Sequence, residues 1–102
     1  MDTRVARCMM IARVLAADGI FTDDERDFLE TAMDNQGLSP EERQSVRDFE
    51  GWADAEPIVT KFTLDEKQTL MDGLVQAVLV DGKVSPLEME TIERLSRALG
   101  LG

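Results

Sequence analysis

Histidine and tyrosine are absent from this chain of 102 residues, and cysteine and tryptophan occur once each. The absence of histidine excludes general base catalysis by imidazole, haem ligation by histidine and the usual zinc sites. A single cysteine excludes an internal disulfide and any metal cluster held by several cysteines. These absences predict a domain that is not an enzyme.

Basic residues are also scarce: Lys and Arg total 11 against 21 Asp and Glu, which gives a net charge of −10. Such a charge opposes binding to nucleic acid or to an anionic membrane surface, because phosphate recognition needs basic side chains. Hydrophobic residues make up 43% of the chain, a globular rather than a disordered composition. We expect one domain with a single core that needs no disulfide.

Long hydrophobic runs are missing as well. The longest, residues 8–17, has ten positions and is interrupted by Arg13, whereas a membrane-spanning helix needs about 20 apolar residues. A signal peptide is an alternative interpretation of this segment, with Arg4 and Arg7 before it. The repeat described next requires the segment as a structural helix. We therefore expect no direct membrane insertion, a cytoplasmic location and a reduced Cys8.

The chain repeats itself at an offset of 63 residues, which aligns residues 17–38 with residues 80–101. Each copy contains Asp-Gly, a hydrophobic residue, Thr or Ser, a Glu three positions later and a final Gly-Leu. Two copies at a long period predict a pseudo-twofold domain rather than a solenoid. The single domain 1–102 then divides into a first repeat at about 5–38, connecting helices at 39–63 and a second repeat at about 64–101.

Helix starts are marked by four capping boxes, in which a Thr or Ser is followed three residues later by Glu. Gly37 and Gly100 are placed to end helices in a left-handed turn. No segment alternates with the period of a strand, so no sheet is expected. We predict an all-α fold of five to six helices, with two helix-loop-helix units facing each other. The predicted ranges are 3–17, 23–36, 40–53, 64–80 and 86–99, with a short helical turn near 56–62.

The predicted helices differ in how they should be buried. Those at 3–17 and 64–80 are apolar nearly all round in their C-terminal halves, which predicts two central helices. The helix at 40–53 should be an outer one, burying a stripe of Val46, Phe49 and Ala53.

The two Asp-Gly loops are the candidate metal site. Each matches the second half of an EF-hand loop, with an acidic residue, the glycine and a Glu at the final ligand position. The first half fails in both copies, because helical apolar residues occupy the positions of the first acidic ligands. A regular EF-hand cage therefore cannot form. The candidate ligands are four carboxylates: Asp18, Glu25, Asp81 and Glu88. Oxygen ligands favour a hard cation such as Ca²⁺, Mg²⁺ or Mn²⁺.

A purely structural interpretation of the same loops stays open. Asp-Gly is an ordinary turn pair, and Thr or Ser followed by Glu is an ordinary capping box. Convergence of the four carboxylates would require a counter-cation, but the sequence does not tell whether they converge.

The doubled Asp-Gly-x-hydrophobic-Ser/Thr-x-x-Glu motif, with an apolar helix before each copy and Gly-Leu after it, resembles the TerB-like family over about residues 5–101. That family is associated with bacterial tellurite resistance and stress response. The resemblance implies an all-helical pseudo-twofold fold and a divalent metal bound through the acidic residues of both repeats, here Asp18, Glu25, Asp81 and Glu88. It also implies protein partners associated with the membrane. The alternative is a metal-free helical adaptor that binds a protein partner.

Overall fold

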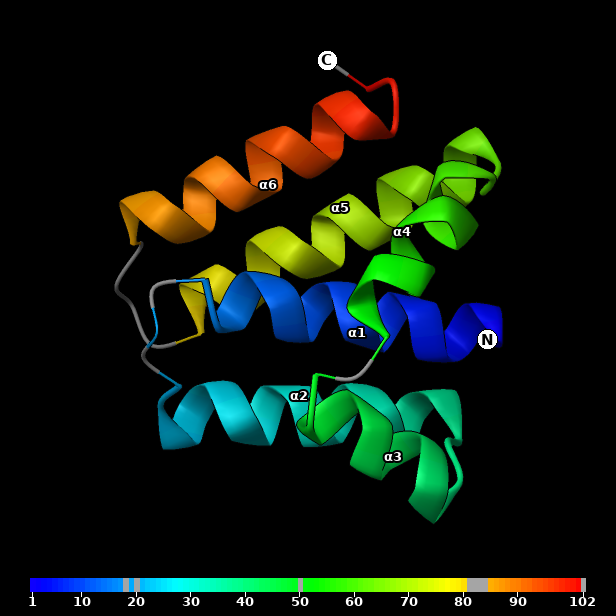
Figure 1. The fold of residues 1–102 in the computed structure, drawn as a ribbon. Helices are drawn as coiled ribbons and strands as arrows, with labels where there is room; N and C mark the ends of the chain where they lie inside the picture. Colours follow the sequence, from blue (N-terminus) through cyan, green and yellow to red (C-terminus); the bar gives the residue numbers. More distant parts are fainter. Residues whose placement is uncertain (18, 20, 50, 81–84, 102) are drawn as a thin grey trace.

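The computed structural model describes residues 1–17, 19, 21–49, 51–80 and 85–101. These residues form six helices and no strand, which confirms the predicted all-α fold (Figure 1). The helices are α1 (Thr3–Leu15), α2 (Asp23–Gln36), α3 (Pro40–Arg47), α4 (Trp52–Thr60), α5 (Leu64–Leu79) and α6 (Pro86–Ala98).

The helix starts follow the predicted capping boxes. Thr22, Ser39 and Thr63 each accept a hydrogen bond from the backbone amide three residues later, and the Glu at that position accepts one from the cap amide. Ser85 caps α6 by accepting hydrogen bonds from the amides of Leu87 and Glu88. These bonds satisfy amides that have no partner inside the helix.

Two helix ends follow the predicted glycines. Gly37 ends α2 with a φ of 66°, and Gly100 follows α6 with a φ of 78°. Glycine adopts this left-handed conformation without the steric cost that a Cβ would bring.

The predicted helix at 40–53 is wrong, because α3 already ends at Arg47. Phe49 has a φ of 57° and Gly51 one of 79°, and two left-handed residues cannot continue a right-handed helix. A nine-residue helix, α4, begins at Trp52 and includes Pro57, where only a short turn was expected. The predicted apolar stripe is also broken: Val46 is buried, but Phe49 and Ala53 are exposed.

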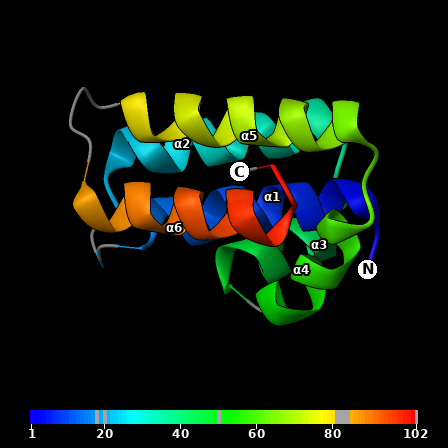
Figure 2. The ribbon, with the colours of Figure 1, turned by 90° about the horizontal axis from the view of Figure 1, so that it is seen from above.

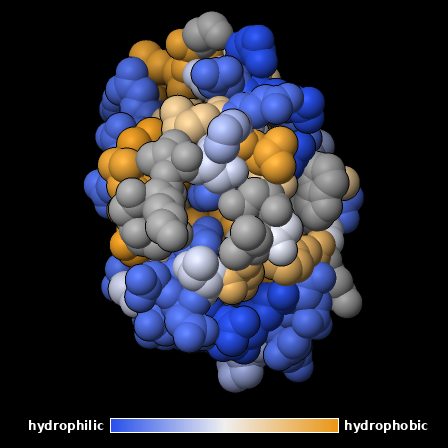
Figure 3. Space-filling model, turned by 90° about the vertical axis from the view of Figure 1, so that its left-hand side faces the viewer, coloured by the Kyte–Doolittle hydropathy of each residue, from blue (hydrophilic) through white to orange (hydrophobic). Residues whose placement is uncertain are grey.

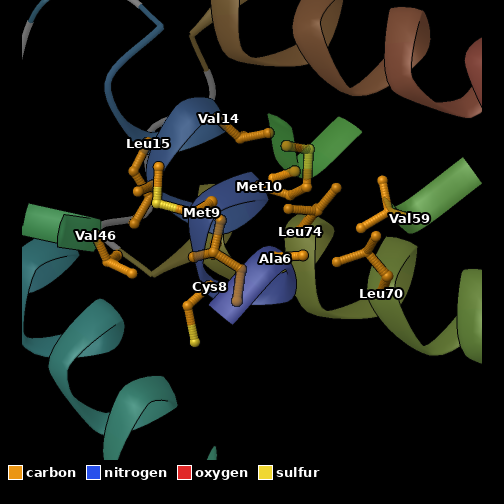
Figure 4. Packing of buried hydrophobic residues seen from close by; sticks show 14 of the residues in the cluster. Ala6, Cys8, Met9, Met10, Val14, Leu15, Val46, Val59, Leu70 and Leu74 are labelled. Atoms are coloured by element: carbon orange, nitrogen blue, oxygen red, sulfur yellow. The ribbon is translucent and has the colours of Figure 1, made fainter. Parts of the chain in front are cut away.

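The core is built around α1, which contacts all five other helices (Figure 2). Nine of its thirteen residues are buried, as expected for a central helix. Figure 4 shows side chains of α1 pointing in several directions toward α3, α4 and α5. Met9 and Met10 are fully buried there with Leu74, and Val46 and Val59 reach the same cluster from α3 and α4.

The second predicted central helix, α5, is buried on one side only. Leu70, Leu74, Ala77 and Val78 face the core, but Val75 and Leu79 are 42% and 55% exposed. Figure 2 shows α5 at an edge of the helix bundle rather than at its centre. This prediction was wrong because an apolar face of a helix is buried only where another element packs against it, and the sequence of α5 does not specify that neighbour.

No helix within the described residues is long and apolar enough to cross a membrane.

Candidate functional site

In the sequence, the two Asp-Gly segments stand between α1 and α2 and between α5 and α6. The end of α1, the start of α2, the end of α5 and the start of α6 all lie at the same end of the helix bundle (Figures 1 and 2). Figure 3 looks onto this end. Hydrophilic side chains dominate its lower part, where α2 begins, and hydrophobic side chains lie in its middle and upper parts. The fold therefore brings the starts of α2 and α6, with their acidic residues, to one end of the molecule.

Glu25 occupies the third position of α2 and is 3% exposed. Its Oε1 accepts a hydrogen bond from the backbone amide of Thr22 at 3.2 Å, and its own amide donates to Thr22 Oγ1 at 3.1 Å. The second carboxylate oxygen, Oε2, is buried, and no described residue donates a hydrogen bond to it. No Lys or Arg of the described chain forms an ion pair with Glu25.

Glu88 occupies the equivalent third position of α6 and is 4% exposed. Its amide donates a hydrogen bond to Ser85 Oγ at 3.5 Å, and the amide of Leu87 donates to the same oxygen at 3.2 Å. Among the described residues, Glu25 and Glu88 are the only charged residues classed as buried. Both predicted glutamates are therefore held below the surface at the same end of the bundle.

Capping alone does not explain this burial. Glu42 and Glu66 complete the same capping box at the starts of α3 and α5, yet both remain partly exposed. Oε2 of Glu66 also lies 3.6 Å from Nη2 of Arg7. The pKa of Glu66 is lowered, chiefly by its hydrogen bonds with Thr63. A buried charge is costly unless it is paired, so Glu25 differs from these ordinary caps in a way that calls for a partner.

The other two predicted ligands, Asp18 and Asp81, lie outside the described residues. Within the described part of the chain, no group of three or more acidic, histidine or cysteine side chains could hold a metal ion. The described chain thus supplies two buried carboxylates, and the four-carboxylate site remains a prediction.

The side-chain groups present limit the chemistry that is possible at this end of the molecule. A buried carboxylate oxygen without a hydrogen-bond donor is satisfied by a proton, a water molecule or a cation. Carboxylate oxygens favour hard cations, which take the rest of their ligands from carbonyls or water. Such a group can bind an ion.

An exposed apolar group near the end of α5 and the start of α6 was not predicted from the sequence. Val75 and Leu79 on α5, Val80 directly after it and Leu87 on α6 are between 39% and 55% exposed. Val75 and Leu79 are four residues apart and therefore share one face of α5. This apolar spacing can be seen in the sequence. The spacing predicts an apolar face but does not predict its exposure, because burial depends on the neighbouring helices.

Comparison with known proteins gives one match that covers nearly the whole chain. The family model described as "Tellurite resistance protein TerB" matches residues 4–102. No curated protein and no solved structure shows a significant match. The family match confirms the resemblance inferred from the two Asp-Gly loops.

Proposed function

Because the chain belongs to the TerB family of tellurite resistance proteins, we propose that it is an accessory domain that binds a divalent metal ion through its two Asp-Gly loops. The residues proposed to hold the ion are Glu25 and Glu88, with Asp18 and Asp81 from the loops. When bound, the ion would supply positive charge to buried carboxylates. The proposed role is ion binding without catalysis.

One observation supports this proposal above the others, namely the buried Oε2 of Glu25 without a donor among the described residues. A native protein leaves few buried polar atoms unsatisfied, and each one calls for a physical explanation. A cation would satisfy the oxygen and offset the cost of burying the charge. The nearly equal burial of Glu88 supports a role for the second repeat in the same function.

The residues also indicate how tight such binding would be. Each loop offers at most two carboxylates, so water or backbone carbonyls must complete the coordination shell. We therefore expect modest affinity, and a preference for Ca²⁺, Mg²⁺ or Mn²⁺ over Zn²⁺. Because the ligands must be ionised, binding should weaken as the pH falls toward the pKa range of carboxylates.

Thermal unfolding with and without metal tests the proposal. Protein treated with a chelator and dialysed is titrated with each ion, because a ligand that binds only the native state must stabilise it. The gain is about 2.7 kcal/mol at a hundredfold excess over the dissociation constant. Glu25→Gln should abolish most of the shift, and Glu42→Gln, at the matched but partly exposed cap, should leave it unchanged. An equal shift in all three proteins, or none at millimolar ion, would contradict the proposal.

A second candidate is a metal-free adaptor for a protein partner, favoured by the exposed apolar side chains near the end of α5 and the start of α6. Exposed apolar groups of this kind are common at protein interfaces. If calorimetry detects no heat of binding for Ca²⁺, Mg²⁺ or Mn²⁺, the adaptor becomes the better supported candidate.

A further inference from the structure

A pocket lies between the start of α2 and the end of α3, separate from the buried glutamates. Its volume is about 380 Å³, within the usual range for sites that bind small molecules. It is lined by two aromatic, one aliphatic and three charged side chains: Phe21, Arg26, Leu29, Glu30, Arg47 and Phe49. The pocket therefore combines apolar and charged side chains in a small volume.

The apolar part of the pocket is an aromatic pair above a buried leucine. The rings of Phe21 and Phe49 meet edge to face, with centroids 6.1 Å apart. Leu29 is 1% exposed and belongs to the core, so it can only form the floor. Phe49 is 37% exposed and has a positive φ, a conformation that is uncommon for residues other than glycine. The break after α3 thus places a phenyl ring at the pocket instead of in the core.

The charged side chains that line the pocket are two arginines and one glutamate. Arg47 donates from Nε and Nη2 to both carboxylate oxygens of Glu30, at 2.8 and 2.6 Å. Arg26 is exposed and forms no ion pair within the described part of the chain, and its guanidinium lies 5.9 Å from the centre of the Phe21 ring. Glu30 therefore offsets one arginine and leaves the charge of the other available.

We infer that this pocket binds a small organic anion in which a carboxylate stands next to an aromatic or short apolar group. The carboxylate would pair with Arg26 and with the remaining Nη1 of Arg47, since a guanidinium matches the planar geometry of a carboxylate. The apolar group would contact the rings of Phe21 and Phe49, where aromatic contacts add to the area buried. The inference is independent of the proposed metal site, because Glu25 does not line the pocket.

The test is a titration of the ¹⁵N-labelled full chain with 3-phenylpropionate, followed by nuclear magnetic resonance. We expect saturable shifts of the amides of Phe21, Arg26 and Leu29. The uncharged analogue 3-phenylpropionamide should bind about tenfold more weakly, because it loses a charge-assisted pair. Equal affinity for the acid and the amide, or shifts that do not saturate, would overturn the inference.

Three variants complete the experiment. Arg26→Gln should weaken binding of 3-phenylpropionate about tenfold, and Arg94→Gln, an exposed arginine of α6, should not change it. Phe49→Gly should weaken binding about fivefold while the protein stays folded, since a φ of 57° suits glycine. Full affinity in Arg26→Gln or in Phe49→Gly would show that the pocket does not bind the anion as inferred.

Discussion

Glu25 and Glu88 hold the same position in two helices that are 63 residues apart in the sequence. Each is the third residue of its helix, and they are 3% and 4% exposed. Glutamate at this position usually caps a helix at the surface, as Glu42 does in α3. The shared burial of the pair separates it from the other capping residues and connects the repeat to the proposed function.

The stability of Glu25→Gln should depend on metal. In chelator-treated protein the change should leave the free energy of unfolding unchanged or raise it, because a neutral amide avoids burying an unpaired charge. In saturating metal the same variant should be less stable than the wild type, by about 1–3 kcal/mol. Urea unfolding under both conditions measures the difference. A variant that is equally destabilised with and without metal would assign Glu25 a capping role only.

Loss of the hydroxyl caps should destabilise the protein. Thr22→Ala removes the acceptor for the amide of Glu25, and Ser85→Ala removes the acceptor for the amides of Leu87 and Glu88. Each change should cost about 0.5–2 kcal/mol, the usual range for an N-cap. The measurement is the urea midpoint at constant slope. Thr22→Ser and Ser85→Thr, which keep a hydroxyl, serve as controls and should lose less.

Cys8 should make the free energy of unfolding fall as the pH rises in the alkaline range. Its side chain is fully buried, and burial raises the pKa of the thiol to about 11. Between about pH 9 and about pH 11 the unfolded thiol loses its proton while the folded one keeps it, so rising pH favours the unfolded state. The stability present below pH 9 should therefore fall across this window.

Comparison with Cys8→Ala isolates the effect of the thiol. The alanine variant should show a shallower decline of unfolding free energy between pH 9 and pH 11 than the wild type. Alkylation by iodoacetamide gives a second readout: at pH 8 the folded wild type should react slowly and the unfolded protein quickly. Parallel pH curves for the two proteins would show that Cys8 ionises normally.

Two glycine substitutions should act in opposite directions. Gly73 lies inside α5, and a Cβ built there meets no atom within 4 Å. Gly73→Ala should stabilise the protein by about 0.4–1 kcal/mol, because alanine is the better helix former. Gly37 has a φ of 66°, so Gly37→Ala should destabilise it by about 1 kcal/mol. Melting temperatures that shift in the same direction would contradict the two assignments.

The sequence by itself determined most helix boundaries, because the signals for them are local. A capping hydroxyl, a Glu three residues later and a glycine after the last turn act on backbone groups within a few residues. For this reason α2 begins after Thr22 and ends before Gly37 as predicted. The two acidic loops and the family resemblance could also be recognised from the sequence, because both depend on residues at fixed spacing.

Only the tertiary structure decided the break after α3 and the exposure of α5. Nothing in the spacing of Val46, Phe49 and Ala53 distinguishes a continuous stripe from one interrupted by left-handed residues. The packing of α1 against the five other helices decides which apolar faces are covered, and it leaves one face of α5 exposed.

The same packing decided which capping glutamates are buried and where the pocket forms. Glu25, Glu42 and Glu66 share one local pattern, but of these three only Glu25 is buried. Phe21 and Phe49 are 28 positions apart and meet only because the chain turns back after Arg47. Local hydrogen bonds are set by neighbours in the sequence, whereas burial is set by the neighbours that the folded chain brings together.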